Sequence, residues 1–199
     1  MNDVNSPADL RKYWDFKYWK CEPVPHLLRT VYPERWVRFH LLPESKRYPE
    51  NEGEYLTVLD RHNTVLAELA VPEETLIFVS TGFSDSPEAA RDDEHLNRLD
   101  RGAQSWLTML DHDFGEEANL RHYSHVFMSK WMWKVGVFDE ILRRVADWEI
   151  ATIMILSTKN DWVFHPYDGG ADFILATTEQ RDRLKSKFEP WLSPRQDGM

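Results

Sequence analysis

A histidine, a tyrosine and two aspartates lie close together in the stretch HPYDGGADFIL, which begins at His165. An imidazole beside carboxylates can perform general acid–base catalysis, because one group takes up a proton and another returns it. The candidate catalytic residues are therefore His165, Asp168 and Asp172, together with His40 from an earlier apolar segment. In this hypothesis one histidine acts as the base, the other acts as the acid or holds an anion, and Arg38 orients an anionic group.

The same stretch is also typical of a tight turn between two antiparallel strands. Asp-Gly pairs favour hairpins, because glycine tolerates the positive φ angles of tight turns. A phosphate-binding loop would lead into a helix, but here an apolar strand follows, and the two aspartates would repel an anion. A calcium loop needs more regularly spaced oxygen ligands. We therefore favour a structural hairpin at residues 168–170, with Trp162–Tyr167 paired to Ala171–Ala176.

Asp172 lies inside an otherwise apolar strand, so its carboxylate is expected to have a partner. A buried carboxylate without a partner costs free energy. Arg38, on the polar face of the strand predicted over residues 35–41, is the candidate partner. We expect a structural ion pair here, and a binding site only if a cleft opens beside it.

Two charged segments are candidate binding sites. The loop Pro43–Pro49 is basic and lies near the polar face of the strand before it. The segment Ser84–Glu117 contains ten acidic residues against three arginines, so it is expected to meet a basic partner. The candidate binding residues are Arg38, Lys46, Arg47, Asp92, Asp93 and Glu94.

Motifs that bind metals or cofactors are absent from the sequence. His122 and His125 are three residues apart, but on a predicted strand their side chains point to opposite faces, so they are not expected to share a metal. Cys21 is the only cysteine, which excludes an internal disulfide and a cysteine-based zinc site. There is no Walker loop, no dinucleotide fingerprint and no Gly-x-Ser-x-Gly elbow. No metal and no cofactor is therefore expected.

Charge and composition restrict the class of protein. The 199 residues carry a formal net charge of −10, which disfavours nucleic acid and anionic membranes and favours a basic protein partner. Apolar residues make up 42% and charged residues 29%, as in globular proteins. The stretch MNDVNSPADL has no secretion signal, and no apolar run approaches the ~18 residues of a membrane helix. We expect a cytoplasmic protein whose nine tryptophans share one core.

The elements that must position these groups are predicted from hydrophobic periodicity to form a single α+β domain, residues 1–199. Short connections between the late strands require antiparallel neighbours, so we expect a mostly antiparallel sheet with helices packed on it and a C-terminal β-meander followed by a helix. The strand–helix–strand unit is a candidate crossover. The segments are a helical N-terminal part (1–33), the strand–helix–strand unit (34–81), an acidic loop region with a short strand and a helical turn (82–118), and C-terminal strands and helices (119–199).

The segments WVRFHLLPESKRYPENEGEY, RHNTVLAEL and WVFHPYDGGADFIL together resemble an uncharacterised bacterial protein family that carries a domain of unknown function. The shared pattern is an Arg-Phe strand, a following helix and a late strand with Tyr-Asp-x-Gly-x-Asp, and the resemblance covers most of residues 35–192. The resemblance implies an α+β bacterial cytosolic protein, and by analogy with other small acidic proteins it implies a role in neutralising a toxin. It implies no catalytic residues.

Two hypotheses for function remain. The first is a protein-binding module of the immunity or regulatory kind, which fits an acidic chain without catalytic motifs. The second is a small hydrolase that uses the histidine, aspartate and arginine cluster near the Tyr-Asp-Gly-Gly turn. The sequence favours the first. The second requires these side chains to converge on a pocket that is open to solvent.

Overall fold

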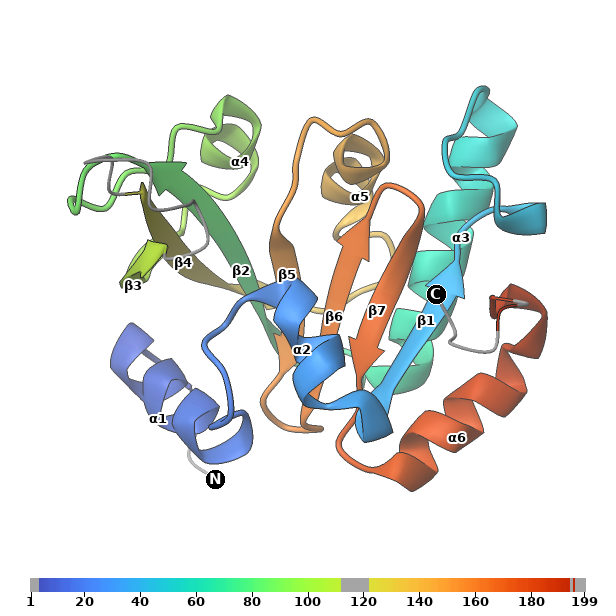
Figure 1. The fold of residues 1–199 in the computed structure, drawn as a ribbon. Helices are drawn as coiled ribbons and strands as arrows, with labels where there is room; N and C mark the ends of the chain where they lie inside the picture. Colours follow the sequence, from blue (N-terminus) through green and yellow to red (C-terminus); the bar gives the residue numbers. More distant parts are fainter. Residues whose placement is uncertain (1–3, 112–121, 194, 196–199) are drawn as a thin grey trace.

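The structure is a computed structural model that describes residues 4–111, 122–193 and 195. Within these residues the chain forms helices on both sides of one seven-stranded sheet (Figure 1). The helices are α1 (Pro7–Lys17), α2 (Pro25–Val31), α3 (Glu52–Leu69), α4 (Glu94–Leu99), α5 (Asp139–Ala146) and α6 (Thr178–Lys187), with short 3-10 turns at Pro33–Arg35, Pro43–Ser45 and Glu189–Trp191. The strands are β1 (Trp36–His40), β2 (Thr75–Ser84), β3 (Gln104–Asp111), β4 (His122–Met132), β5 (Ile153–Ser157), β6 (Trp162–Tyr167) and β7 (Gly170–Ile174).

The strands are ordered β1-β7-β6-β5-β2-β4-β3, and every neighbouring pair is antiparallel. Strands β5, β6 and β7 follow one another in the chain, lie side by side and are followed by α6. These features confirm the predicted α+β class, the antiparallel sheet and the C-terminal meander.

The predicted crossover unit exists as β1, α3 and β2, but its two strands are not neighbours. Three strands, β7, β6 and β5, lie between them, and because each neighbouring pair is antiparallel, β1 and β2 run parallel. The 18-residue helix α3 with its flanking loops is long enough to pass over the strands inserted between β1 and β2.

Each face of the sheet has its own core. Helices α3, α5 and α6 cover one face, where Phe78, Phe164 and Phe173 are buried. Helices α1 and α2 cover the other face, in front of the sheet in Figure 1. The expectation that the tryptophans share one core is therefore wrong. Trp162 of β6 packs in the first core, whereas Trp14 of α1 and Trp106 of β3 pack in the second.

Polar side chains at helix starts explain where three helices begin. The first turn of a helix has unpaired backbone N–H groups, and a side-chain oxygen just before it can accept one of them. Ser6 accepts from Asp9 at α1, Asn51 from Glu54 at α3, and Thr177 from Gln180 at α6, at distances of 3.2, 3.1 and 3.2 Å.

The acidic region predicted as a loop over residues 82–118 is more regular than expected in its described part, which ends at residue 111. Strand β2 continues to Ser84, α4 follows, and β3 is one residue longer than the predicted strand. Pairing with β4 explains the extension of β2, because Gly82, Phe83 and Ser84 each have a partner there. None of the described helices is long and apolar enough to cross a membrane.

Candidate functional site

The predicted hairpin is confirmed. Strands β6 and β7 pair from Val163 with Ile174 through Tyr167 with Gly170, which leaves Asp168 and Gly169 as the turn. Gly170 is buried, and a Cβ built on it would lie 2.4 Å from the hydroxyl oxygen of Tyr167. A side chain at this position would therefore displace the tyrosine ring.

The carboxylate of Asp168 holds the turn against two other segments. It accepts a short hydrogen bond from Nε of Arg47, in the loop between β1 and α3, and it interacts with the polar groups of Trp148 and Tyr48. Burial raises the pKa of Asp168, but hydrogen bonds from Arg47 and Trp148 and the charge of Arg47 lower it further, so the net pKa lies below its ordinary value. Asp168 is therefore ionised at neutral pH and cannot act as a general acid.

Arg47 is the centre of a small aromatic surface. Its guanidinium carbon lies 5.3 Å from the ring centre of Tyr48 and 5.8 Å from that of Trp148. Its alkyl chain covers the turn so closely that a Cβ on Gly169 would lie 2.9 Å from Cγ of Arg47. Lys46, the other basic residue predicted here, does not join this surface, because its ammonium group is 2.7 Å from Glu54 and 3.0 Å from Glu50.

Trp148 is unusual in both backbone and exposure. Its φ angle is +63°, in the left-handed region that bulky residues seldom adopt, and 61% of its surface is exposed. The two flanking acids, Asp147 and Glu149, are exposed as well. Helix α5 ends at Ala146, so this corner projects the indole ring away from the core.

A largely apolar hollow of about 200 Å³ lies beside Trp148. It forms on the β5 side of the end of β6, where residues 165–167 have no strand pairing with β5 and lie beside the loop that precedes it, while β7 pairs with them on the other side. Its lining residues are Val145, Trp148, Ile150, Ala151, Thr152, His165, Pro166, Tyr167 and Asp168. We define the Trp148 surface as this hollow together with Arg47 and Tyr48.

The expected ion pair between Arg38 and Asp172 is confirmed. Arg38 donates from Nε and Nη2 to the two carboxylate oxygens of Asp172, at 2.7 and 2.9 Å, and both side chains are at least nine-tenths buried. The guanidinium also lies 5.0 Å from the ring centre of Tyr167 and 5.4 Å from that of Trp36. The hollow lining does not include either charged group, so this pair is structural.

The two candidate catalytic histidines are not brought together. Arg38 pairs with Asp172, which pairs with His165, whereas His40 pairs with Gly170, so β7 separates the histidines and they are offset by two residues. Two strand spacings alone place their Cα atoms about 10 Å apart.

The contacts and pKa shifts of His165 and His40 also differ. Nδ1 of His165 is 2.8 Å from the carbonyl oxygen of Ile153. Burial lowers the pKa of both rings, and the charge of Arg38 lowers that of His40 further. His165 lines the hollow and His40 does not. The candidate residues thus form no acid–base pair around one pocket.

Of the three acids proposed to meet a basic partner, one has a structural task. Asp93 accepts a hydrogen bond of 2.8 Å from the backbone N–H of Leu96 and so caps α4, whereas Asp92 and Glu94 are exposed. His95 in the same helix lies 3.6 Å from Glu149, so the acidic start of α4 is next to the corner that carries Trp148.

Sequence reasoning missed Trp148 and Tyr48 as functional candidates. Trp148 was expected to belong to the core with the other tryptophans. A tryptophan between two acids, only five residues before a buried strand, was the one available signal of an exposed corner. Among the described residues no group of three His, Cys, Asp or Glu side chains could hold a metal ion.

Comparison with known proteins gives a family without an assigned activity. No curated protein and no solved structure is similar enough to this chain to count as a match. A family model described as a domain of unknown function, DUF3885, matches residues 24–196. This match confirms the resemblance to an uncharacterised domain family and covers most of the chain, from α2 through the last described residues. The chain therefore belongs to the DUF3885 family.

Proposed function

We propose that this chain is a protein-binding module and that the Trp148 surface is where its partner binds. The observation that carries the proposal is an exposed tryptophan, held in a left-handed backbone conformation, that walls an apolar hollow. A non-glycine residue in this region costs on the order of 1 kcal/mol or more, and such residues persist where the surrounding structure determines them, often at functional sites.

The composition of the surface fits protein recognition. Tryptophan, tyrosine and arginine are the residues that most often dominate the binding free energy of protein interfaces. All three occur here, and the ion pair of Arg47 with Asp168 fixes the arrangement before a partner arrives. The hollow is smaller than the pockets of about 300–1,000 Å³ that bind small molecules, so it suits one apolar side chain of a partner.

Charge favours a basic partner. Asp147 flanks Trp148, the exposed acids Asp92 and Glu94 lie on the adjacent α4 segment, and the whole chain has a net charge of −10, whereas the other flanking acid, Glu149, is paired with Arg144. Complementary charges would speed association and oppose acidic competitors. A partner with an exposed apolar side chain inside a basic surface is the chemistry that this site would recognise.

The test is a comparison of variants in partner capture from native cells, followed by titration calorimetry with the purified partner. Trp148→Ala is expected to weaken binding at least tenfold. Trp19→Ala is the matched control, because Trp19 is 71% exposed and follows α1, on the other side of the sheet from α5. Replacing Asp92 and Glu94 by Asn and Gln is expected to reduce the salt dependence of binding. Equal binding by wild type and Trp148→Ala would refute the proposal.

A further inference from the structure

Strand β4 continues beyond the beginning of its neighbour β3. The first residue of β3, Gln104, pairs with Met128, while β4 runs on to Met132. Residues 129–132 therefore pair with β2 on one side only. In an antiparallel strand the backbone N–H and C=O groups of every second residue point toward the same neighbour. No backbone group in the described part of the chain bonds to the open side of these four residues.

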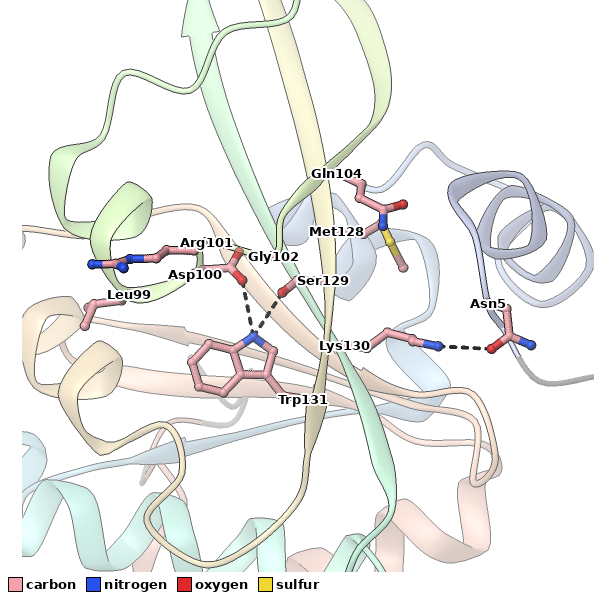
Figure 2. A pocket seen from close by; sticks show the side chains of 10 residues that line it. All are labelled: Asn5, Leu99, Asp100, Arg101, Gly102, Gln104, Met128, Ser129, Lys130 and Trp131. Carbon is pink, nitrogen blue, oxygen red and sulfur yellow. Dashed lines mark hydrogen bonds between the residues drawn. The ribbon is translucent and has the colours of Figure 1, made fainter.

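A hollow of about 320 Å³ lies at this open edge. Figure 2 shows that Trp131 and Lys130 point to opposite sides of β4, Trp131 toward Asp100 and Lys130 toward Asn5. The hollow is thus lined from both faces of the sheet, at the place that a longer β3 would occupy. Its lining residues are Asn5, Leu99, Asp100, Arg101, Gly102, Gln104, Met128, Ser129, Lys130 and Trp131.

The apolar wall of this hollow is fixed in place. Nε1 of Trp131 donates to the hydroxyl of Ser129 at 2.9 Å and lies 3.4 Å from a carboxylate oxygen of Asp100. Asp100 is in turn paired with Arg91 at 2.9 Å, and both side chains are more than nine-tenths buried. A ligand would therefore meet a preformed surface, which lowers the entropy cost of binding.

Of the described residues, the charged side chains at this edge that have no partner of opposite charge are positive. Lys130 Nζ donates to the neutral side chain of Asn5 at 3.0 Å, and the one acid in the lining, Asp100, is already neutralised by Arg91. Arg101 is exposed. Across residues 4–111 and 122–193, neither Arg101 nor Lys130 has a carboxylate partner. In a chain with net charge −10, two such cations at one hollow favour an acidic ligand.

We propose that the open edge of β4 binds an extended, acidic peptide segment of another protein, which adds to the sheet as a strand. The peptide backbone pairs with residues 129–132, and its side chains alternate between the two faces. An acidic side chain lies beside Lys130, and the next residue along, an apolar one, packs against Trp131. This site is separate from the Trp148 surface and does not depend on it.

The experiment selects binders from a randomised hexapeptide library and measures fluorescence anisotropy with the enriched, labelled peptides. The expected peptides alternate acidic and apolar residues. Lys130→Glu is expected to weaken their binding at least tenfold, and Arg101→Glu to weaken it severalfold. Lys134→Glu is the matched control, because Lys134 is also exposed but lies beyond the end of β4. Its affinity for the peptide should equal that of the wild type.

Backbone pairing is tested on the peptide itself. A strand added at an edge uses every second amide, so N-methylation of one alternate set of amides should abolish binding while methylation of the other set should not. Failure to enrich any peptide, enrichment of basic peptides, insensitivity to Lys130→Glu, or equal tolerance of both methylated sets would each overturn the proposal. Trp148→Ala should leave peptide affinity unchanged, so a failure of this site and a failure of the Trp148 surface are distinguishable.

Discussion

At one end of the sheet, β1 is paired with β7 along all five of its residues, whereas near the other end β4 runs four residues beyond the start of β3. On the outer side of β1, the carbonyl oxygen of His40 accepts a hydrogen bond of 2.8 Å from Nη1 of Arg61. Residues 129–132 of β4 have no backbone partner on their open side in the described part of the chain, and they face a hollow lined by two cations.

Two arginines, one near each end of the sheet, differ in whether a carboxylate pairs with them. Arg38 was a candidate binding residue in the sequence, but its guanidinium donates two hydrogen bonds to the buried carboxylate of Asp172, which balances its charge. Arg101 stood out in no pattern, but it is exposed beside a hollow and retains its charge for a ligand. Unpaired sheet edges attract other strands, so proteins usually cover them, and an edge left open is a candidate binding site.

The largest effect is expected at the end of the sheet where β1 pairs fully with β7, which we call the closed end. Arg38→Ala removes both hydrogen bonds to Asp172, which is 5% exposed, and leaves a buried carboxylate. The free energy of unfolding should fall by about 3–5 kcal/mol. Urea denaturation followed by tryptophan fluorescence measures this loss. Arg101→Ala at the open edge should change the same quantity by less than about 0.5 kcal/mol.

A double variant tests whether Arg38→Ala loses stability because it leaves the buried carboxylate of Asp172 without this partner. Arg38→Met with Asp172→Leu removes both charges, and buried ion pairs replaced by apolar residues of similar volume are often neutral in stability. This variant should recover most of the stability that Arg38→Ala loses. Equal unfolding midpoints for Arg38→Ala and Arg101→Ala would contradict the contrast between the two ends.

A second prediction concerns pH and the core beneath β6. His62 of α3 packs against Phe164, and burial lowers its pKa from 6.5 to about 3. Between these two values the unfolded chain binds more protons than the folded one, so stability falls as the pH falls from about 6.5 to about 3. From pH 7 to pH 4 this group should remove about 3 kcal/mol.

Urea denaturation at both pH values, on the wild type and on His62→Leu, measures the contribution of His62. The variant should lose less stability on acidification, and a smaller slope should remain from His40 and His165, whose pKa values are also lowered. Identical slopes in both proteins would mean that His62 is not the group responsible. Peptide binding at the β4 edge involves no residue near His62 and should not follow this titration.

A third, smaller effect is expected where β7 meets β1 and β6. A Cβ on Gly170 would lie 2.4 Å from the Tyr167 hydroxyl and 2.9 Å from the backbone oxygen of Phe39. Because a backbone atom cannot easily move away, Gly170→Ala should lower the unfolding free energy by about 1–3 kcal/mol. Gly102→Ala, where a Cβ meets nothing within 4 Å, is the control and should not lose stability by this mechanism. A loss in Gly102→Ala as large as that in Gly170→Ala would show that the steric argument is wrong.

Most of the closed end could be predicted from sequence because its signals are local. Asp-Gly chemistry places the turn between β6 and β7, and a lone acid in an apolar strand requires a cation such as Arg38. Once the hairpin is known, strand pairing fixes which face each side chain points to. The extension of β2 to Ser84 could not be predicted, because it depends on pairing with Tyr123 and its neighbours far along the chain.

The two surfaces that carry the proposals could not be predicted, because they depend on where elements stop. Trp148 is exposed because α5 ends two residues earlier and the backbone turns into the left-handed region, and the amphipathic pattern of the helix continues through that point. The β4 edge is open because β3 starts late relative to its partner. Element ends are the least certain part of any reading of periodicity.

The smallest effect is expected in α4, the helix beside the open edge of β4. Asp93 caps α4, and Leu99 at the end of this helix and Arg101 just after it line the hollow beside β4. Asp93→Ala should lower the unfolding free energy by about 1 kcal/mol, since the N–H of Leu96 loses its acceptor. Amide hydrogen exchange should speed up in α4 and not in β1 or β7. Asp92→Ala removes the same charge without a cap and should change neither measurement, so equal effects of the two variants would show that charge, and not capping, stabilises this wall.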